Sequence, residues 1–401
     1  MPARPHATAP EAARPWVLAT GDTVITRPSQ CDPRLAQLLA DAEITFTNLE
    51  APLTTRGSAA EKAATHRACP EAAGWLTELG ITAVSLANNH AMDYGPVGLS
   101  DTITALTQAG IAAVGAADTL PAAMAAHHQV TSRGTVALLG LSSALPPGFA
   151  ATATRPGVAP LRVLQQIALD PVLAAEQPGM APYVHTTAHA PDLDEACAAV
   201  EAARREAEVV IVAMHWGVPH GFAAASYGTL AEYQRPVGHA LIDAGATVVL
   251  GHHPHVVHPI EIVGGGLIAY SVGNLMFHNW DHFSGTADQS ARSRPTSSWA
   301  GDNTGLFPLE APAAPYRSAF NAPETRDSVV VQIMPPDQGR LTIQFLPTTM
   351  HQGDPVIPGA THCHTILDRL ENHDAAHQHG RLTRRTDMID DAVIGEVQIN
   401  A

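Results

Sequence analysis

The sequence predicts an α/β fold for most of its 401 residues. From Trp16 to about Gly273, short apolar runs rich in β-branched residues alternate with Ala-rich stretches of helical periodicity. Turns rich in Gly, Asn and His separate the two kinds of segment. Strands that alternate with helices are typical of a sheet whose functional residues lie at the carboxyl ends of the strands.

The alternation defines the elements in chain order. The expected strands are Trp16–Ala19, Ile44–Asn48, Ala83–Leu86, Ala112–Val114, Val136–Leu141, Val209–Met214, Val248–Leu250, Val256–Val263 and Leu267–Ser271. The expected helices between them are Pro33–Ala42, Glu71–Leu79, Val97–Gln108, Leu193–Ala207 and Leu230–Asp243.

Two segments interrupt this pattern. Residues 145–190 are rich in Pro and Ala, and within them we expect a helix at Arg162–Ala168. Residues 283–326 shift to Ser, Ala, Pro, Gly and Asn, which predicts either a plain loop or a lid over a substrate. Beyond them we expect a hairpin of Ser328–Met334 with Leu341–Pro347, and a helix at Thr365–Asn372. The predicted organisation is a tail at 1–15, a catalytic domain at 16–282, the loop or lid at 283–326, and closing strands with a C-terminal tail at 327–401.

Composition and charge narrow the range of functions. The chain carries 22 Lys and Arg against 38 Asp and Glu, a net charge of −16, and 45% of its residues are hydrophobic. Such a chain can bury a large core. With Lys62 as its single lysine, it offers no cationic stripe for a phosphate backbone or an anionic membrane surface. We therefore expect neither nucleic acid nor membrane as a partner.

Three further features favour a cytoplasmic, bacterial protein. The tail at 1–15 contains no apolar run of the length that a signal peptide or membrane anchor requires. The four cysteines lie far apart, without CxxC spacing or the density of a disulfide scaffold. The abundance of Ala and Arg is typical of a GC-rich bacterial genome.

Metal-competent side chains follow five of the expected strands. Each group places a carboxylate, an amide or an imidazole where a parallel sheet opens its crevice. A single Gly-Asp or His indicates little, but five such groups in order indicate a site. The groups are Gly21-Asp22, Asn48-Leu49-Glu50, Asn88-Asn89-His90 with Asp93, His215-Trp216-Gly217, and Gly251-His252-His253-Pro254-His255.

The order of these groups resembles the calcineurin-like metallophosphoesterase superfamily, and within it the CapA family of poly-γ-glutamate and capsule synthesis proteins. The resemblance covers roughly Trp16 to Phe277 and implies a four-layer α/β/β/α sandwich, the metallo-dependent phosphatase fold, with a metal site at one edge of two facing sheets. It rests on FTNLEAPLT at Phe46–Thr54, SLANNHAMDYG at Ser85–Gly95, HWG at His215–Gly217, DAGATVVLGHHPHV at Asp243–Val256 and AYSVGN at Ala269–Asn274.

The resemblance also implies a ligand set. The metal ligands would be Asp22, Glu50 in place of a bridging aspartate, Asn89 through its amide oxygen, His215, His253 and His255. His252 competes with His253, because the glycine-histidine motif can be aligned on either residue. His90, which follows the ligand asparagine, would be a free acid with Asp93 as its orienting partner.

One departure from the superfamily bears on the number of ions. Phosphoesterases of this kind usually show Asp-x-His after the first strand, whereas Val24 stands at the third position here. In-line phosphoryl transfer relies on two ions about 3.5–4 Å apart. We therefore expect a single divalent ion. Oxygen ligands beside imidazoles suit Ca, Mn or Zn and leave its identity open.

One ion with spare His and Asp side chains favours proton transfer. An ion on a carboxylate or amide carbonyl stabilises the enolate formed when a base removes the adjacent Cα proton, and an acid on the other face can return a proton. That reaction is epimerisation. The two groups it needs would be His90 with Asp93, and one of His252, His253 or His255 with Asp22 or another carboxylate.

Three functions compete on this evidence. The first is a metal-dependent peptide epimerase. A branch of the CapA family serves lasso-peptide biosynthesis, and resemblance to it implies a ribosomal precursor peptide whose C-terminal residue is inverted at Cα. The second is a CapA-type poly-γ-glutamate or capsule synthesis protein, or a metallophosphoesterase-like hydrolase. The third is a metal-stabilised binding module. The missing phosphoesterase histidine and the lack of an apolar anchor run favour the first.

Overall fold

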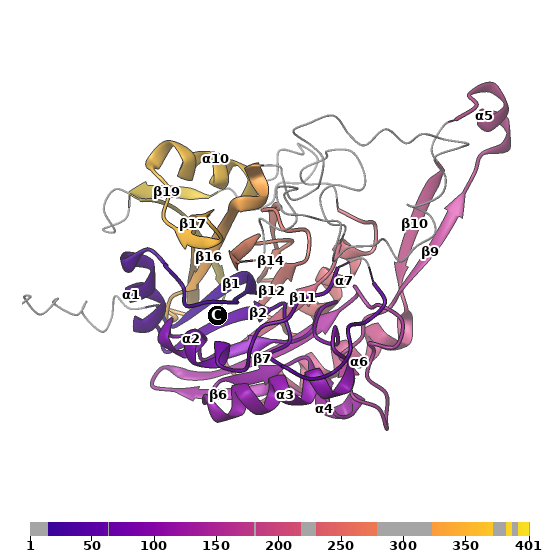
Figure 1. Ribbon diagram of the computed structural model, residues 1–401. Helices are drawn as coiled ribbons and strands as arrows, with labels where there is room; N and C mark the ends of the chain where they lie inside the picture. The colour runs from indigo at the N-terminus through magenta and orange to yellow at the C-terminus, as the bar shows by residue number, and fades with distance from the viewer. Residues whose placement is uncertain are drawn as a thin grey trace, which may run out of the picture.

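Two sheets lie face to face in a computed structural model that describes residues 15–62, 64–179, 182–217, 230–278, 323–371, 382–386 and 392–400. Helices pack on the outer face of each sheet, which gives the expected four-layer α/β/β/α sandwich (Figure 1). The predicted tail at 1–15 lies outside the described residues except for Pro15. The predicted loop at 283–326 lies outside them except for a short 3-10 helix at Pro323–Arg326.

The larger sheet has a parallel half and an antiparallel half, in the order β19-β20-β17-β16-β1-β2-β3-β4. Strand β1 pairs with β2 on one side, and on the other side with β16 along its first residues and with β15 along its last. The strands are β1 Val17–Val24, β2 Ile44–Leu49, β3 Ala83–Ser85, β4 Ala112–Val114, β15 Asn274–Phe277, β16 Asp327–Ile333, β17 Arg340–His351, β18 Asp354–Val356, β19 Thr383–Thr386 and β20 Val393–Asn400.

The second sheet has the order β13-β14-β12-β11-β7-β6. Its four central strands are parallel, and its two edge strands, β13 and β6, are antiparallel to their neighbours. The strands are β6 His127–Thr131, β7 Gly134–Ser142, β11 Val209–His215, β12 Val248–His252, β13 Ile260–Val263 and β14 Gly266–Ala269. A separate two-stranded pair joins β5 Ala116–Ala117 to β8 Gly157–Val158.

Side-chain alternation along the strands separates the layers. In β1, Val17 and Ala19 pack into the core between the sheets, whereas Leu18 faces the helices on the outer side. Helices α1 Pro33–Asp41, α2 Ala72–Glu78 and α3 Gly95–Gln108 cover the larger sheet, and α4 Leu120–Met124, α6 Ala190–Arg204 and α7 Gln234–Asp243 cover the second. Helix α10, Ala360–Leu370, packs its apolar side into the core between the sheets.

Several predicted elements differ from the structure. The hairpin of closing strands is confirmed as β16 with β17, and the tail helix begins earlier than expected, at Ala360. The strand expected at Val256–Val263 is confined to Ile260–Val263, because the residues before it form the loop that carries the histidines. None of the helices in the described part of the chain has the length and hydropathy needed to cross a bilayer.

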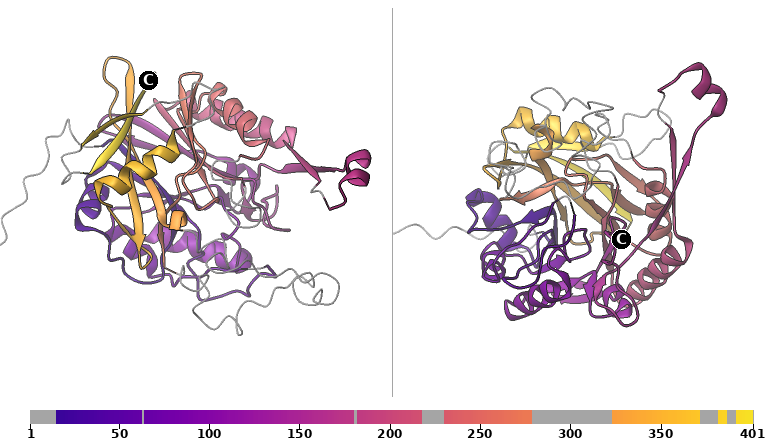
Figure 2. Two further views of the ribbon diagram at one scale, coloured as in Figure 1. Left: turned by 90° about the horizontal axis from the view of Figure 1, so that it is seen from above. Right: turned by 45° about the vertical axis from the view of Figure 1, so that its right-hand side comes forward.

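The prediction of a helix at Arg162–Ala168 is wrong. These residues form strand β9, Val163–Ala168, which pairs antiparallel with β10, Tyr183–Ala188. The β-branched Val163 and Ile167 favour the extended backbone, and cross-strand pairing decides the outcome over a short apolar run. Together with helix α5, Pro171–Glu176, the two strands form an arm that projects from the sandwich (Figures 1 and 2).

Candidate metal centre

The predicted polar groups meet at one edge of the sandwich. Strand register brings Asp22 of β1 opposite Asn48 of β2 and Asn274 of β15, and brings His215 of β11 opposite His252 of β12. Because these parallel strands all end at this edge, the side chains that follow them converge. The sequence places its carboxylates on the larger sheet and most of its imidazoles on the second, so the site lies between the two.

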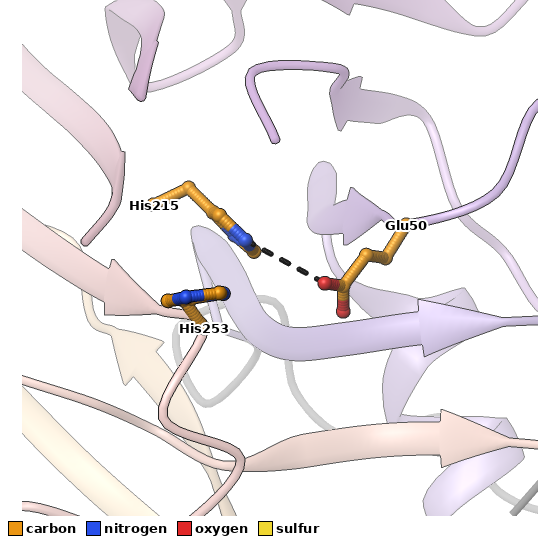
Figure 3. Close-up of side chains that lie close together, drawn as sticks. All are labelled: Glu50, His215 and His253. Atoms are coloured by element: carbon orange, nitrogen blue, oxygen red, sulfur yellow. Dashed lines mark ion pairs between the residues drawn. The ribbon is translucent and has the colours of Figure 1, made fainter. Parts of the chain in front are cut away.

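Glu50, His215 and His253 form one candidate ligand group, with one donor atom of each lying within 4.8 Å of the others. His215 and Glu50 point toward each other, with Nε2 of His215 3.5 Å from Oε1 of Glu50 (Figure 3). The amide oxygen of Asn89 lies 2.8 Å from the same Nε2. Ligand atoms bound at about 2.0–2.2 Å to one ion lie about 3 Å from each other, so these four residues fit a shared ion.

A second candidate group consists of Asp22, Glu50 and His255. Nδ1 of His255 lies 3.3 Å from Oδ2 of Asp22 and 2.8 Å from the amide oxygen of Asn274. The side-chain amide of Asn48 donates to the other oxygen of Asp22 at 2.7 Å, which orients that carboxylate. Glu50 belongs to both groups and therefore lies between them.

Glu50 provides the main test of whether a cation fits. The residue is fully buried, and neither carboxylate oxygen has a hydrogen-bond partner among the described residues. Burial and the nearby Asp22 carboxylate raise the pKa of Glu50 well above its ordinary value. A buried, unpartnered carboxylate is costly, and a divalent cation between Glu50 and the imidazoles would remove that cost. The donor set of oxygen and nitrogen atoms fits such an ion.

The imidazoles in the first group are in the form that binds metals. Burial and the neighbouring His253 hold the pKa of His215 well below its usual value. Burial and the neighbouring His255 lower the pKa of His253 to about 3. Both rings are therefore neutral at pH 7, and neutral imidazole is the ligand form.

Backbone geometry places His252 and His253 differently. His253 and His255 have φ angles of 96° and 58°, in the left-handed region that residues other than glycine rarely adopt. This turn directs both rings into the site. His252 instead belongs to strand β12, where its Nε2 lies 3.1 Å from the carbonyl oxygen of Thr20, outside both ligand groups. His252 therefore lies outside both ligand groups, and its catalytic role stays a prediction.

His90 and Asp93 form a pair beside the ligands. Nδ1 of His90 lies 2.6 Å from Oδ2 of Asp93, and Nε2 of His90 lies 4.0 Å from Oε1 of Glu50. Burial and the charge of Lys62 hold the pKa of His90 well below its usual value, so the ring is neutral and can accept a proton. The pair lies outside both ligand groups, and its acid–base role stays a prediction.

Two residues that contact the His90–Asp93 pair were not identified from the sequence. The ammonium of Lys62 lies 2.7 Å from Oδ1 of Asp93 and also donates to the backbone carbonyl of Asn89. The backbone amide of His66 donates to Oδ2 of Asp93 at 2.6 Å, and its ring lies 4.0 Å from the ring of His90, centroid to centroid. They precede the Asn89-His90 motif in an irregular loop, and the one available signal was that Lys62 is the single lysine.

Val24 occupies the position at which the Asp-x-His pattern has a histidine. Its side chain is buried in a small apolar cluster with Ala51, Phe277 and Met350. The position therefore supplies packing rather than a ligand, and Asp22, Glu50 and His255 are left as the three members of the second group.

Comparison with protein families identifies the chain. The profile of the family described as "Bacterial capsule synthesis protein PGA_cap" matches residues 10–279, which include every residue of both ligand groups. The chain belongs to the PGA_cap family. The matched region runs from the segment before β1 to the end of β15.

Relatives within the PGA_cap family carry capsule and polymer names. The chain is 32% identical over 203 residues to "PGA biosynthesis protein CapA" of Bacillus subtilis, which covers 50% of this chain and 44% of that protein. It is 36% identical over 241 residues to "Probable polyglutamine synthesis accessory protein" of Mycobacterium tuberculosis, with coverages of 58% and 55%. The chain thus spans about half the length of the curated relatives it matches.

A solved structure also aligns with this PGA_cap chain. It is the calcineurin-like phosphoesterase YfkN from Bacillus subtilis, with 12% identity, a TM-score of 0.33, and coverage of 85% of this chain and 87% of the other.

Proposed function

We propose that the chain is a metal-dependent peptide epimerase, which inverts a Cα centre by proton transfer between two His/Asp pairs. The observation that carries the proposal is the position of these pairs around Glu50. His90 with Asp93 lies beside one of its oxygens, and His255 with Asp22 belongs to the ligand group that shares Glu50. Removal and return of a proton on opposite faces of a carbon needs two such groups.

The two pairs differ in protonation, which suits the assignment of a base and an acid. His90 is neutral at pH 7, because burial and Lys62 lower its pKa. Burial would also lower the pKa of His255, but the carboxylates of Glu50 and Asp22 outweigh it and raise that pKa to about 9. His90 would therefore accept the Cα proton, and His255 would deliver a proton to the other face.

In a single-ion centre, His255 would pair with Asp22 rather than bind the ion, since its Nδ1 lies 3.3 Å from Oδ2 of Asp22. Glu50, Asn89, His215 and His253 then hold one ion, which when bound would polarise a substrate carboxylate or amide carbonyl next to the reacting Cα. Asp93 orients His90, and Lys62 holds Asp93 in place.

The substrate we propose is the C-terminal residue of a ribosomal precursor peptide of the lasso-peptide class. A peptide that presents a carboxylate fits a centre that would hold a divalent cation between Glu50 and the imidazoles. The net charge of −16 and the single Lys62 favour a substrate with one carboxylate over a polyanion.

Isotope exchange tests the proposal directly. The purified protein is incubated in D₂O with the precursor peptide encoded beside its gene, with and without EDTA, and the peptide is analysed by mass spectrometry and chiral amino-acid analysis. Incorporation of one deuteron into an uncleaved peptide with an inverted residue, abolished by EDTA, is the expected result. Exchange that proceeds unchanged in EDTA, or no exchange with the metal-loaded protein, would refute it.

A CapA-type role in poly-γ-glutamate or capsule synthesis, with hydrolytic chemistry, is the second candidate. The names of the relatives favour it, and so does the sharing of Glu50 between two ligand groups, because a bridging carboxylate is typical of two-metal sites. In this case Asp22, Glu50 and His255 would hold a second ion instead of a proton.

Metal stoichiometry separates the two candidates. One tightly bound ion per chain by inductively coupled plasma mass spectrometry fits the epimerase. Two ions per chain, together with cleavage of poly-γ-glutamate or p-nitrophenyl phosphate, would establish the hydrolase. The exchange experiment serves as the independent check, because a hydrolase would release fragments without inverting a centre.

A further inference from the structure

The segment between β2 and α2 bonds to Asp93 at three points. The ammonium of Lys62 lies 2.7 Å from one carboxylate oxygen, Oδ1. The backbone amide of His66 donates to the other oxygen, Oδ2, at 2.6 Å. The backbone amide of Ala60 donates to the main-chain carbonyl of Asp93 at 2.8 Å. One segment therefore fixes both the carboxylate and the backbone of the residue that pairs with His90.

The ammonium of Lys62 also joins two parts of the centre. Besides its contact with Asp93, it donates to the backbone carbonyl of Asn89, whose side-chain oxygen lies beside His215. The ring of Phe149 lies next to the same ammonium, with its centroid 5.5 Å from Nζ. An ammonium has three donors and no acceptor. Lys62 can therefore bond to the carboxylate and to the backbone of the ligand segment at the same time.

Burial distinguishes this ion pair from the other ion pair of the segment. The side chain of Lys62 is 15% exposed and that of Asp93 is fully buried. The guanidinium of Arg56 pairs with Asp101, but the Arg56 side chain is 66% exposed. Loss of one partner from a buried pair leaves the other charge uncompensated, whereas an exposed pair contributes little. Lys62 should therefore fix its partner, and Arg56 supplies a matched control.

We propose that Lys62 is a positioning residue for the proton transfer. Its ammonium holds Asp93 beside the backbone of Asn89. Asp93 in turn keeps Nε2 of His90 directed at Glu50. This inference rests on the proposed function, and it assigns to Lys62 an action through Asp93, with no contact to the ion or to the reacting carbon.

Deuterium exchange into the precursor peptide tests this role. Lys62→Met removes the charge and should lower kcat for exchange about 10–100-fold, the range found for supporting residues of metal centres, with KM unchanged. Lys62→Arg keeps a buried cation and should recover part of the rate, and it also covers the case in which Lys62→Met does not fold. Arg56→Met should exchange at the wild-type rate. A raised KM at unchanged kcat for Lys62→Met, or an equal loss in Arg56→Met, would overturn the proposal.

A double-mutant cycle tests whether Lys62 acts through Asp93. Asp93→Asn alone and combined with Lys62→Met should exchange at nearly the same rate, because two residues that act as one unit are not additive. Losses that multiply in the double variant would show that Lys62 acts independently of Asp93, and the positioning role would be wrong.

Proton NMR of the protein loaded with Ca²⁺ or Zn²⁺ provides a readout that needs no turnover. The Nδ1 proton of His90, shared with Asp93 over 2.6 Å, should give a downfield resonance that disappears in His90→Gln. It should persist in Arg56→Met and be shifted or lost in Lys62→Met.

The resonance also separates this inference from the proposed function. A wild type that shows it without exchanging deuterium would refute the epimerase, and its loss in Lys62→Met would still support the positioning role. An unchanged resonance in Lys62→Met would overturn the positioning role whatever the exchange result, as would its absence from the wild type.

Discussion

Nδ1 of His90 lies 2.6 Å from Oδ2 of Asp93, three residues further along the chain, in a pair that belongs to neither ligand group. The carboxylate fixes the orientation of the ring, so that Nε2 of His90 faces Glu50. The pair therefore has the geometry of an acid–base group held beside a metal centre rather than within it.

His90→Gln should abolish turnover and leave the metal in place. The substitution removes the group that accepts a proton, which lowers the rate of deuterium exchange by about 10²–10⁴-fold. Metal content by plasma mass spectrometry should match that of the wild type, because the three residues of the first group and Asn89 remain. Loss of the ion along with activity would contradict the separation of ligand from acid–base residue.

His215→Ala should lose the ion, whereas His252→Ala should keep it. His215 contacts both Glu50 and Asn89. His252, which lies on the strand next to that of His215, contacts the carbonyl oxygen of Thr20 instead. Loss of one ligand weakens metal affinity by at least the 10–100-fold seen for the supporting residues of such sites. Isothermal titration with Mn²⁺ and Ca²⁺ measures both variants, and equal losses would show that the alignment on His252 is the correct one.

Tyr233→Phe should weaken metal binding without removing a ligand. The hydroxyl of Tyr233 accepts a hydrogen bond from the Gly217 amide at 2.7 Å and lies 2.8 Å from Oγ of Ser143, whose own amide donates to the carbonyl of His215. The variant leaves the Gly217 amide without this partner, at a cost of about 1–3 kcal/mol. We expect a lower melting temperature and weaker metal binding.

The control for Tyr233→Phe is Tyr183→Phe, because Tyr183 is exposed by 53% on the arm. Removal of its hydroxyl should change neither property. Equal effects of the two substitutions would contradict the role assigned to Tyr233.

Asp192→Asn should destabilise the base of the arm in a pH-dependent manner. Asp192 accepts hydrogen bonds from the amide and guanidinium of Arg162, which precedes β9, and pairs with His189, which follows β10. Burial alone would raise the pKa of Asp192, but the hydrogen bonds from Arg162 and His189 outweigh it and keep that pKa below its usual value. Since the folded-state pKa is the lower one, the ionised carboxylate stabilises the fold above the unfolded-state pKa of about 3.9.

This stability should be lost as the pH falls through the folded-state pKa of Asp192. Thermal unfolding at pH 7 should show a loss of about 1–3 kcal/mol for Asp192→Asn, and the difference from the wild type should narrow below about pH 4. Asp194→Asn, at an exposed position on the same helix, is the matched control. A difference that stays constant down to pH 3 would show that Asp192 acts through packing alone.

The sandwich and the convergence of the candidate ligands could be predicted because strand periodicity and strand-end motifs are local signals. Asp22, Glu50 and His215 each follow an apolar run directly, and their convergence follows from parallel pairing. The different positions of His252 and His253 could not be predicted, because they depend on a left-handed backbone turn that the two identical side chains do not encode.

Other features depend on contacts distant in sequence. Lys62 reaches Asp93 from an irregular loop, and no periodic pattern marks its position. Residues 162–168 were expected to be helical because β9 acquires its strand partner only after an intervening helix, α5. In both cases the decisive contact joins segments that are distant in sequence, whereas local propensity describes each segment on its own.

One edge of strand β1 pairs with β15 and β16, which are synthesised long after β1. Asp22 lies opposite Asn274, and Val17 lies opposite Ile333. At a synthesis rate of about 5–20 residues per second, the roughly 300 residues between β1 and β16 take about 15–60 s to translate. During that time the first ligand strand has an open edge on the ribosome. The edge of β1 is therefore completed only after β16 has been made, and a chain truncated before Asp327 would lack the strand that pairs with Val17, Leu18 and Ala19.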